Sequence, residues 1–236
     1  MLPAVIVKIN VLLETICFET DYSFLFLGMN SLKKFDNSFL SNKVKIIAGV
    51  DEAGRGPIAG PVVAAAVIFN NKISHQFVND SKKLNEKTRE ELYVWIIGNS
   101  ISYGIGIVDH EEIDSINILQ ASLKAMKVAA EQLLHSPDLI LIDGNKSFIS
   151  ELHTKPIVKG DSKSFCVAAA SIIAKVTRAR IMKKLSSEHP EYLWMQNKGY
   201  PTKAHIEAVR KYGITSFHRK TFLSRILNEG NQISIF

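Results

Sequence analysis

Hydrophobic residues become regularly spaced only from Val44 onward. Beyond that point short apolar runs alternate with segments of helical periodicity, and most runs are bounded by glycine, proline or asparagine. Apolar runs of this length between turn residues predict buried β-strands. The expected strands lie at residues 43–50, 61–69, 101–109, 137–144 and 155–160.

The segments between these runs predict helices. Residues 85–99 carry one apolar face, and residues 115–134 form a longer amphipathic stretch for which Ser115 is the expected N-cap. Residues 162–185 begin almost entirely apolar and end strongly basic, which predicts one long helix. Two short helices are expected after the loop at 197–205.

Alternating strands and helices, with some strands in direct succession, favour an α/β layered fold with a mixed sheet over a bundle or a sandwich. Residues 1–43 lack this periodicity and predict an irregular extension. One hypothesis for the extension is that translation starts at Met29. We expect the main domain at residues 44–190 and a basic helical region at residues 191–236.

Composition is that of a folded globular protein. The chain has 236 residues, of which 46% are hydrophobic and 22% charged, so it is not a disordered protein. Cys17 and Cys166 cannot form a disulfide framework and have no metal-ligand partner nearby in sequence, which predicts a reducing, cytoplasmic setting. No apolar run is long enough to span a bilayer, so we expect no membrane contact. We also expect the protein to be a monomer.

Positive charge is concentrated near the C-terminus. The net charge is +6, yet residues 175–236 hold 12 basic against 4 acidic residues, whereas residues 44–174 hold 13 against 15. A neutral body with a basic end suits a polyanionic partner such as nucleic acid. A solvated basic helix face is the open alternative.

Acidic residues follow three of the predicted strands. Asp51 and Glu52 end the first, Asp143 ends the fourth, and Asp161 follows the fifth. Functional crevices of open α/β sheets lie beyond strand ends, so these acids are candidates for one shared site.

Each acid also has a structural alternative. Asp143 could form an ordinary turn with the glycine after it, and Asp161 could cap the following helix. Neighbours on a regular strand point to opposite faces, which would bury Asp51 or Glu52 in the sheet core. The glycines that follow predict instead that the strand has ended and that both side chains turn to one side.

Four carboxylates brought together repel one another, and bound divalent cations relieve that repulsion. Hard oxygen ligands favour Mg²⁺ or Mn²⁺. Two such ions can activate water and stabilise the leaving oxygen in phosphodiester cleavage. With the basic region to hold phosphates, the residues predict a metal-dependent nuclease.

Six motifs, in order, carry a close resemblance to a known family. They are "AGVDEAGRGPIAGPVVAAAVIF", "DSKKL", "LIDG", "VKGD", "AAASIIAKVTR" and "KGYPTKAH". From Ile46 to Phe222 the chain resembles bacterial ribonuclease HII. The resemblance implies a ribonuclease H-like α/β fold, in which helices flank a five-stranded mixed sheet and a small helical extension at the C-terminus binds substrate.

The resemblance also implies an activity. Such enzymes cleave the RNA strand of RNA–DNA hybrids and incise duplex DNA on the 5′ side of single embedded ribonucleotides, which serves ribonucleotide and RNA primer removal. They use two Mg²⁺ or Mn²⁺ ions and leave 3′-hydroxyl and 5′-phosphate ends. Carried onto this sequence, the catalytic and metal-binding acids are Asp51, Glu52, Asp143 and Asp161.

By the same resemblance, Gly54-Arg55-Gly56 is the loop that reads the 2′-hydroxyl of the ribonucleotide beside the scissile bond. Glycines permit close approach of the backbone, the 2′-hydroxyl both donates and accepts, and Arg55 offers a cationic fork to phosphate. Tyr200 matches the tyrosine that packs against the deoxyribose on the 3′ side of the ribonucleotide.

The resemblance marks further nucleic-acid contacts and some departures. The expected contacts are Lys82, Lys83, Ser171, Lys175, His218 and Arg219. Ser162 stands where the family usually has alanine, Leu193 where it has glycine and Asn197 where it has histidine. The last two changes predict a different path for the loop before Tyr200.

Several alternatives are less consistent with the residues. Ribonuclease HIII usually lacks the Gly-Arg-Gly motif, and a resolvase or transposase of similar fold would not explain it. A non-catalytic hybrid-binding module would not need four clustered acids, and a nucleotide-dependent enzyme would need a P-loop that this chain lacks. The tail with Ile233, Ile235 and Phe236 predicts contact with a sliding clamp, or else packing on the domain.

Overall fold

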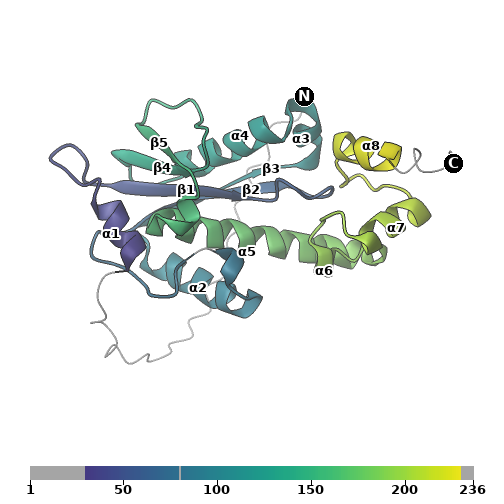
Figure 1. Ribbon diagram of the computed structural model, residues 1–236, viewed down its shortest axis with the longest axis horizontal. Coiled ribbons are helices and arrows are strands. Elements are labelled where there is room, and N and C mark those ends of the chain that lie inside the picture. The colour runs from purple at the N-terminus through teal and green to yellow at the C-terminus, as the bar shows by residue number, and fades with distance from the viewer. Residues whose placement is uncertain (1–29, 80, 230–236) are drawn as a thin grey trace.

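The protein is built around a five-stranded mixed sheet with the strand order β3-β2-β1-β4-β5 (Figure 1). The computed structural model describes residues 30–79 and 81–229. The strands are β1 (Ile47–Ala53), β2 (Val62–Ile68), β3 (Ser102–Val108), β4 (Leu139–Asp143) and β5 (Thr154–Ile157). Central strand β1 is antiparallel to β2 and parallel to β4, which confirms the predicted mixed sheet.

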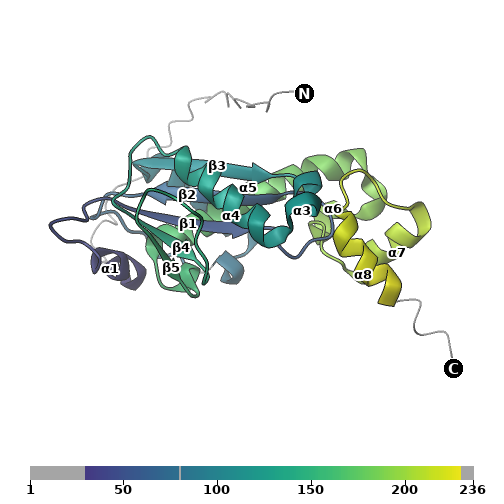
Figure 2. The same ribbon diagram turned by 90° about the horizontal axis from the view of Figure 1, so that it is seen from above.

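Helices cover both faces of this sheet. They are α1 (Ser31–Asn37), α2 (Glu86–Asn99), α3 (His110–Ile116), α4 (Ile118–Glu131), α5 (Phe165–Glu188), α6 (Trp194–Asn197), α7 (Lys203–Tyr212) and α8 (Lys220–Glu229). Figures 1 and 2 show α3 and α4 on one face, α2 and α5 on the other, and α6, α7 and α8 gathered at one end. Among the described helices, none is both long and apolar enough to cross a bilayer.

Small residues bring the long helix α5 directly against the central strand. A Cβ atom added at Gly49 of β1 would lie 2.2 Å from backbone atoms of Cys166 and Val167 in α5. The alanine-rich start of α5 is fully buried on the same face, as its composition predicted. This close packing places the polar residues farther along α5 beside the acidic end of β1.

The N-terminal extension is not irregular throughout, so that prediction is wrong for Ser31–Asn37, which form α1. Leu32 packs into the core beneath the sheet, and Asp36 Oδ2 accepts a hydrogen bond from the Cys166 backbone N–H at 2.9 Å. The helix was missed because its stability comes from docking against α5, not from a long periodic pattern of its own. The Met29 start-site hypothesis concerns residues outside the described ones.

The predicted helix at 115–134 is two helices with a break. Ser115 lies in the last turn of α3, and Asn117 is the N-cap of α4, where its side chain accepts from the backbone N–H groups of Leu119 and Gln120. Asn117 has φ 68°, in the left-handed region that asparagine tolerates better than serine does. The prediction of Ser115 as the cap is therefore wrong.

Candidate active site

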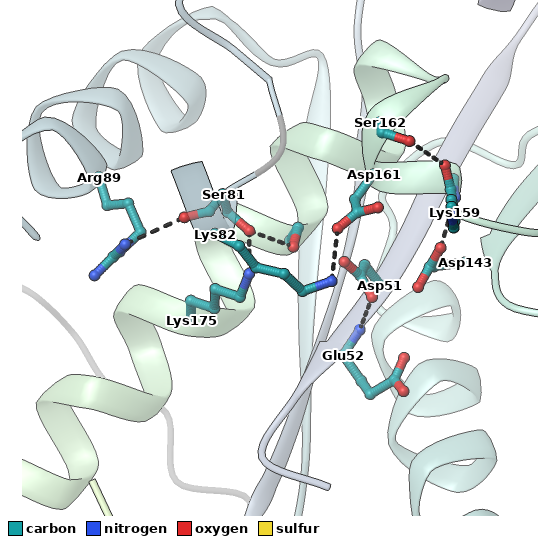
Figure 3. Close-up of polar contacts among 12 residues, drawn as sticks. Asp51, Glu52, Ser81, Lys82, Arg89, Asp143, Lys159, Asp161, Ser162 and Lys175 are labelled. Carbon is teal, nitrogen blue, oxygen red and sulfur yellow. Dashed lines mark hydrogen bonds and ion pairs between the residues drawn. The ribbon is translucent and has the colours of Figure 1, made fainter. Parts of the chain in front are cut away.

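The four predicted acids come together at one end of the sheet (Figure 3). Asp51 and Glu52 are in β1, Asp143 is the last residue of the parallel neighbour β4, and Asp161 lies in a short 3₁₀ turn (Gly160–Ser162) just before α5. Because β1 and β4 run the same way, their carboxyl ends meet at one edge of the sheet.

Strand β1 does not end before its acids, contrary to the prediction. It continues to Ala53, and Asp51 pairs with Ala65 while Glu52 pairs with Ala64 of the antiparallel strand β2. Neighbouring residues of a regular strand point to opposite faces, and Asp51 faces Ser171 of α5. The prediction that both side chains turn to one side is therefore wrong.

Asp51 is the most strongly perturbed of the acids. Its side chain is buried at 4% exposure, and its Oδ1 accepts from the Glu52 backbone N–H at 2.7 Å. Burial raises the pKa of Asp51 well above its ordinary value, the nearby charges of Glu52 and Asp143 raise it further, and a hydrogen bond from Ser171 opposes the rise. The protein by itself therefore disfavours the charged form of Asp51, which a cation would stabilise.

Glu52 has one satisfied and one unsatisfied oxygen. Oε1 lies 3.3 Å from Arg55 Nη1, whereas Oε2 is buried and has no hydrogen-bond partner among the described residues. Burial raises the pKa of Glu52, and the Arg55 guanidinium opposes that rise. A buried carboxylate oxygen without a partner is costly unless another group binds it.

Asp143 and Asp161 complete the cluster. Asp143 Oδ1 accepts from the Gly160 backbone N–H at 2.6 Å, and burial raises the pKa of Asp143. Asp161 Oδ2 lies 3.2 Å from Lys82 Nζ. Ser164 caps α5, so the alternative role of Asp161 as the helix cap is wrong.

The donor set fits divalent cations in an open site. Within residues 30–79 and 81–229, no three acidic, histidine or cysteine side chains converge closely enough to enclose an ion by themselves. Mg²⁺ seldom needs such a cage, since it keeps waters and binds through one or two carboxylates together with substrate phosphates. The raised pKa values of three acids and the unpartnered Glu52 Oε2 are the features that bound cations would relieve.

A pocket of about 370 Å³ opens beside the acids. Glu52, the Gly54-Arg55-Gly56 loop and Tyr200 all line it. A Cβ atom added at Gly56 would lie 3.3 Å from Cε1 of Tyr200, so loop and tyrosine are in contact range. Tyr200 is 48% exposed, which leaves its ring accessible from the pocket. The structure thus brings together the acids, the loop and the tyrosine that the sequence singled out.

Three of the predicted nucleic-acid contacts instead belong to the hydrogen-bond network around the acids: Lys82, Ser171 and Lys175. Ser171 is buried at 1% exposure, hydrogen-bonds Asp51 and lies 2.8 Å from Ser81 Oγ, which in turn accepts from Lys175 Nζ. Ser171 is therefore buried away from the surface, and the prediction that it faces nucleic acid is wrong. Lys82 and Lys175 both line the pocket. The side chain of Lys83 lies outside what the structure describes.

His218 and Arg219 are both fully buried, so the predicted contact with a nucleic-acid backbone is wrong. Arg219 instead donates to backbone carbonyls of the Gly54–Gly60 segment. The His-Arg motif gave no sign of this role, because polar pairs near a basic C-terminus are ordinarily exposed.

Arg178, a buried residue that also lines the pocket, was not predicted from the sequence. Its position offered one signal: Ser171, Lys175 and Arg178 are spaced by four and three residues, which places them on one face of α5. Arg89 and Lys198 line the same pocket and were also not predicted.

Leu193 adopts φ 56° and ψ 34°, a left-handed conformation that suits the glycine expected at this position. Asn197 donates to the Tyr192 carbonyl at 2.7 Å and accepts from the Gly199 N–H at 2.8 Å. The loop before Tyr200 thus carries local hydrogen bonds of its own.

Comparisons with known proteins match most of the chain. The family model described as Ribonuclease HII matches residues 48–225. Ribonuclease HII of Clostridioides difficile is 49% identical over 199 residues, covering 84% of this chain and 78% of that protein. Ribonuclease H2 of Pyrococcus horikoshii superposes with a TM-score of 0.64 at 31% identity, over 75% of this chain and 93% of that one. The Archaeoglobus fulgidus RNase HII in a complex with PCNA gives a TM-score of 0.60 at 27% identity, over 74% and 94% of the two chains.

Proposed function

The chain belongs to the ribonuclease HII family of hydrolases, which cleave the RNA of RNA–DNA hybrids and remove ribonucleotides from DNA, and we propose that Asp51, Glu52, Asp143 and Asp161 form its catalytic centre. The observation that carries this assignment is the meeting of four acids from three separate segments beside one pocket. Three of these acids have raised pKa values, as expected of a site built for another charge.

Enzymes of this family depend on divalent metal ions, and we assign Mg²⁺ or Mn²⁺ to these carboxylates. When bound, two such ions supply an activated water and stabilise the leaving oxygen. Glu52 would offer its unpartnered Oε2, and Asp51 would offer an oxygen that is held in place by Ser171 and the Glu52 N–H. The hydrogen bond from Gly160 similarly orients Asp143.

The remaining pocket residues bind and orient the substrate. Arg55 lies beside Glu52 with its side chain 52% exposed, within reach of a phosphate that enters the pocket. Lys82 and Lys175 also line the pocket, where their positive charge attracts the phosphate backbone. The helical region at residues 191–236 supplies Tyr200, so we assign substrate binding to it.

The Gly54–Gly56 loop is assigned to reading the ribose. It follows β1 directly, so the segment that carries Asp51 and Glu52 also carries the loop. A backbone group that senses the 2′-hydroxyl is then adjacent to the acids that cleave the neighbouring bond. This adjacency supports incision on the 5′ side of an embedded ribonucleotide, with 3′-hydroxyl and 5′-phosphate products.

The test uses two end-labelled duplexes, one all DNA and one identical except for a single ribonucleotide. Each is incubated with the protein in Mg²⁺, in Mn²⁺ and in EDTA, and the products are sized. We expect a metal-dependent nick 5′ of the ribonucleotide and no cleavage of the all-DNA duplex. Cleavage of both duplexes would refute the ribose-reading role of the loop, and cleavage in EDTA would refute the metal assignment.

A sliding clamp is the partner that we assign to the C-terminal tail. The Archaeoglobus fulgidus relative is seen in a complex with PCNA, and this chain ends in an apolar segment with Ile233, Ile235 and Phe236, which lie outside the described residues. Clamp immobilised on resin should retain the full-length protein and lose it when residues 231–236 are deleted. Equal retention of both proteins would refute the tail as the contact.

A further inference from the structure

Two arginines are buried directly beneath the ribose-reading loop. Arg219 is 0% exposed and is among the largest fully buried side chains, and Arg178 of α5 is 4% exposed. Burial lowers the pKa of Arg219 to about 9 and that of Arg178 to about 10, and both values still leave the side chains charged at neutral pH. Two buried guanidinium charges need strong compensation.

Backbone carbonyls provide that compensation. Arg219 donates to Gly54 O at 2.7 Å, Pro57 O at 2.8 Å, Gly60 O at 2.9 Å and Arg55 O at 3.2 Å. Arg178 donates to Lys198 O at 2.8 Å, Pro61 O at 2.9 Å and Ala59 O at 3.1 Å. Together the two side chains bind most of the carbonyls between Gly54 and Pro61.

This arrangement determines where the N–H groups of the loop point. A trans peptide is planar, with its C=O and N–H on opposite sides, and the described chain has no cis peptide bonds. Since the carbonyls of Gly54 and Arg55 point at Arg219, the N–H groups of Arg55 and Gly56 point away from it. Within the described residues, neither N–H group donates to another protein group.

Those same residues line the pocket beside the acids. Gly54, Arg55 and Gly56 form one wall of it. Two N–H groups without protein acceptors are suited to an oxygen of the substrate. The guanidinium behind each carbonyl polarises the peptide and so strengthens the N–H as a donor.

Arg178 connects this loop to the segment that carries Tyr200. It binds the Lys198 carbonyl and the carbonyls of Ala59 and Pro61, which follow the loop. In addition, the Ile58 N–H donates to Gly199 O at 2.8 Å. Gly54 has φ 101°, and a Cβ atom there would lie 2.2 Å from Arg178 Nε. The glycine is therefore required for the arginine to pack under the loop.

We propose that Arg178 and Arg219 are positioning residues for ribose recognition. Arg219 holds the carbonyls of Gly54 and Arg55 inward, so that the Arg55 and Gly56 N–H groups face the 2′-hydroxyl. Arg178 packs beneath Gly54 and ties the residues after the loop to the segment that carries Tyr200. The proposal rests on the proposed function of the loop. The role that we assign to both arginines is exerted through the peptide groups that they bind. A lysine at either position keeps the charge but cannot bind three or four carbonyls in a fixed plane.

The test measures binding preference in a protein that does not cleave. In an Asp51→Asn background with Mg²⁺, dissociation constants are measured for the all-DNA duplex and the duplex with a single ribonucleotide. Their ratio does not depend on the fraction of active protein. Arg219→Lys and Arg178→Lys are each compared with Arg210→Lys, a change at an exposed arginine of α7. Thermal melting confirms that each variant is folded.

We expect each of the two buried changes to lower the preference for the ribonucleotide at least about fivefold, as expected for weakening one or two hydrogen bonds. Affinity for the all-DNA duplex and the ratio for Arg210→Lys should both stay within about twofold of the parent. An unchanged ratio in a folded Arg219→Lys or Arg178→Lys protein would overturn the proposal. So would loss of folding in both, because the arginines would then be general supports of the fold.

The two proposals fail differently. A parent protein with no preference for the ribonucleotide would refute ribose reading by the loop itself. A parent with a clear preference that both lysine variants retain would refute only the role of the arginines.

Discussion

The Nε2 atoms of His205 and His218 lie 3.2 Å apart in the buried interior of the C-terminal region. The Thr215 backbone N–H donates to His218 Nδ1 at 3.0 Å, so the proton of His218 is on Nε2, which donates to His205. His205 Nε2 also accepts from Trp194 Nε1 at 2.9 Å, and its Nδ1–H donates to the Tyr200 carbonyl at 2.9 Å. Because His218 accepts at Nδ1 and His205 accepts at Nε2, both histidines must be neutral.

Acid should therefore destabilise this region. Burial, together with the neighbouring His205, His189 and His110, lowers the pKa of His218 from 6.5 to about 4. Burial also lowers the pKa of His205. Between pH 6.5 and about 4 the unfolded chain binds a proton at His218 that the folded chain does not. Stability is then lost as the pH falls through this window, by up to about 3 kcal/mol.

Urea unfolding at pH 7.5 and at pH 5 measures this loss. We expect His218→Gln to be less stable than the parent at pH 7.5 but to show a smaller loss on acidification. His135→Gln, at an exposed histidine after α4, is the control and should keep the parent's loss. An equal pH dependence for His218→Gln and the parent would contradict the neutral network.

How far the sequence predicts this fold depends on whether a feature is local. The apolar runs predicted all five strands, among them β2, which is buried and apolar along its whole length, and β3, in which buried positions alternate with more exposed ones. The four acids were found because they follow those runs. Helix α1 and the Asn117 cap were missed, since one is stabilised by docking on α5 and the other by a left-handed backbone.

The buried polar residues were the least predictable part of the site. Nothing local marks Arg219 as buried, because its hydrogen-bond partners are carbonyls more than 150 residues earlier in the chain, at |i−j| of 159 to 165. The same is true of Ser171, whose partner Ser81 is 90 residues away. Such residues look like surface contacts until the tertiary structure places them.

The single substitution Asp51→Asn should both abolish cleavage and stabilise the folded protein. The pKa of Asp51 is raised by burial and by Glu52 and Asp143, so its charged form opposes folding at neutral pH. In EDTA at pH 7.5 we expect a higher melting temperature than for the parent, and this gain should shrink as the pH falls and Asp51 becomes protonated. In Mg²⁺ the cleavage rate should fall at least about a hundredfold, because a ligand charge is lost.

Glu151→Gln, at an exposed position outside the site, is the matched control and should change neither quantity. Parent-like cleavage by Asp51→Asn would refute its assignment as a metal ligand. A lower melting temperature in EDTA would show instead that its hydrogen bonds outweigh the repulsion.

Glycine in place of Leu193 should give a more stable protein than alanine does. Its φ of 56° lies in the left-handed region, which costs a residue with a Cβ atom about 1 kcal/mol. Leu193→Gly and Leu193→Ala lose the same exposed side chain, so we expect the glycine variant to melt about 2–4 °C higher. The same pair at Lys184, an exposed helical residue near the C-terminal end of α5, should show the opposite order, because alanine is the better helix former. Equal melting temperatures for the Leu193 pair would mean that the loop relaxes.

Tyr200→Ala should lower cleavage at a single embedded ribonucleotide more than cleavage of a long RNA–DNA hybrid. The ring is half exposed, lies beside Gly56 and faces the pocket, so it can pack on a sugar next to the ribose that the loop reads. A single embedded ribonucleotide always places a deoxyribose there, whereas a long hybrid offers many registers in which other contacts hold the strand. We expect kcat/KM for the single ribonucleotide to fall at least about tenfold more than for the hybrid, as loss of a sugar-packing aromatic would give. Tyr200→Phe keeps the ring and should stay close to the parent on both substrates. Equal losses on the two substrates for Tyr200→Ala would exclude a role at the junction and leave the tyrosine as a general wall of the pocket.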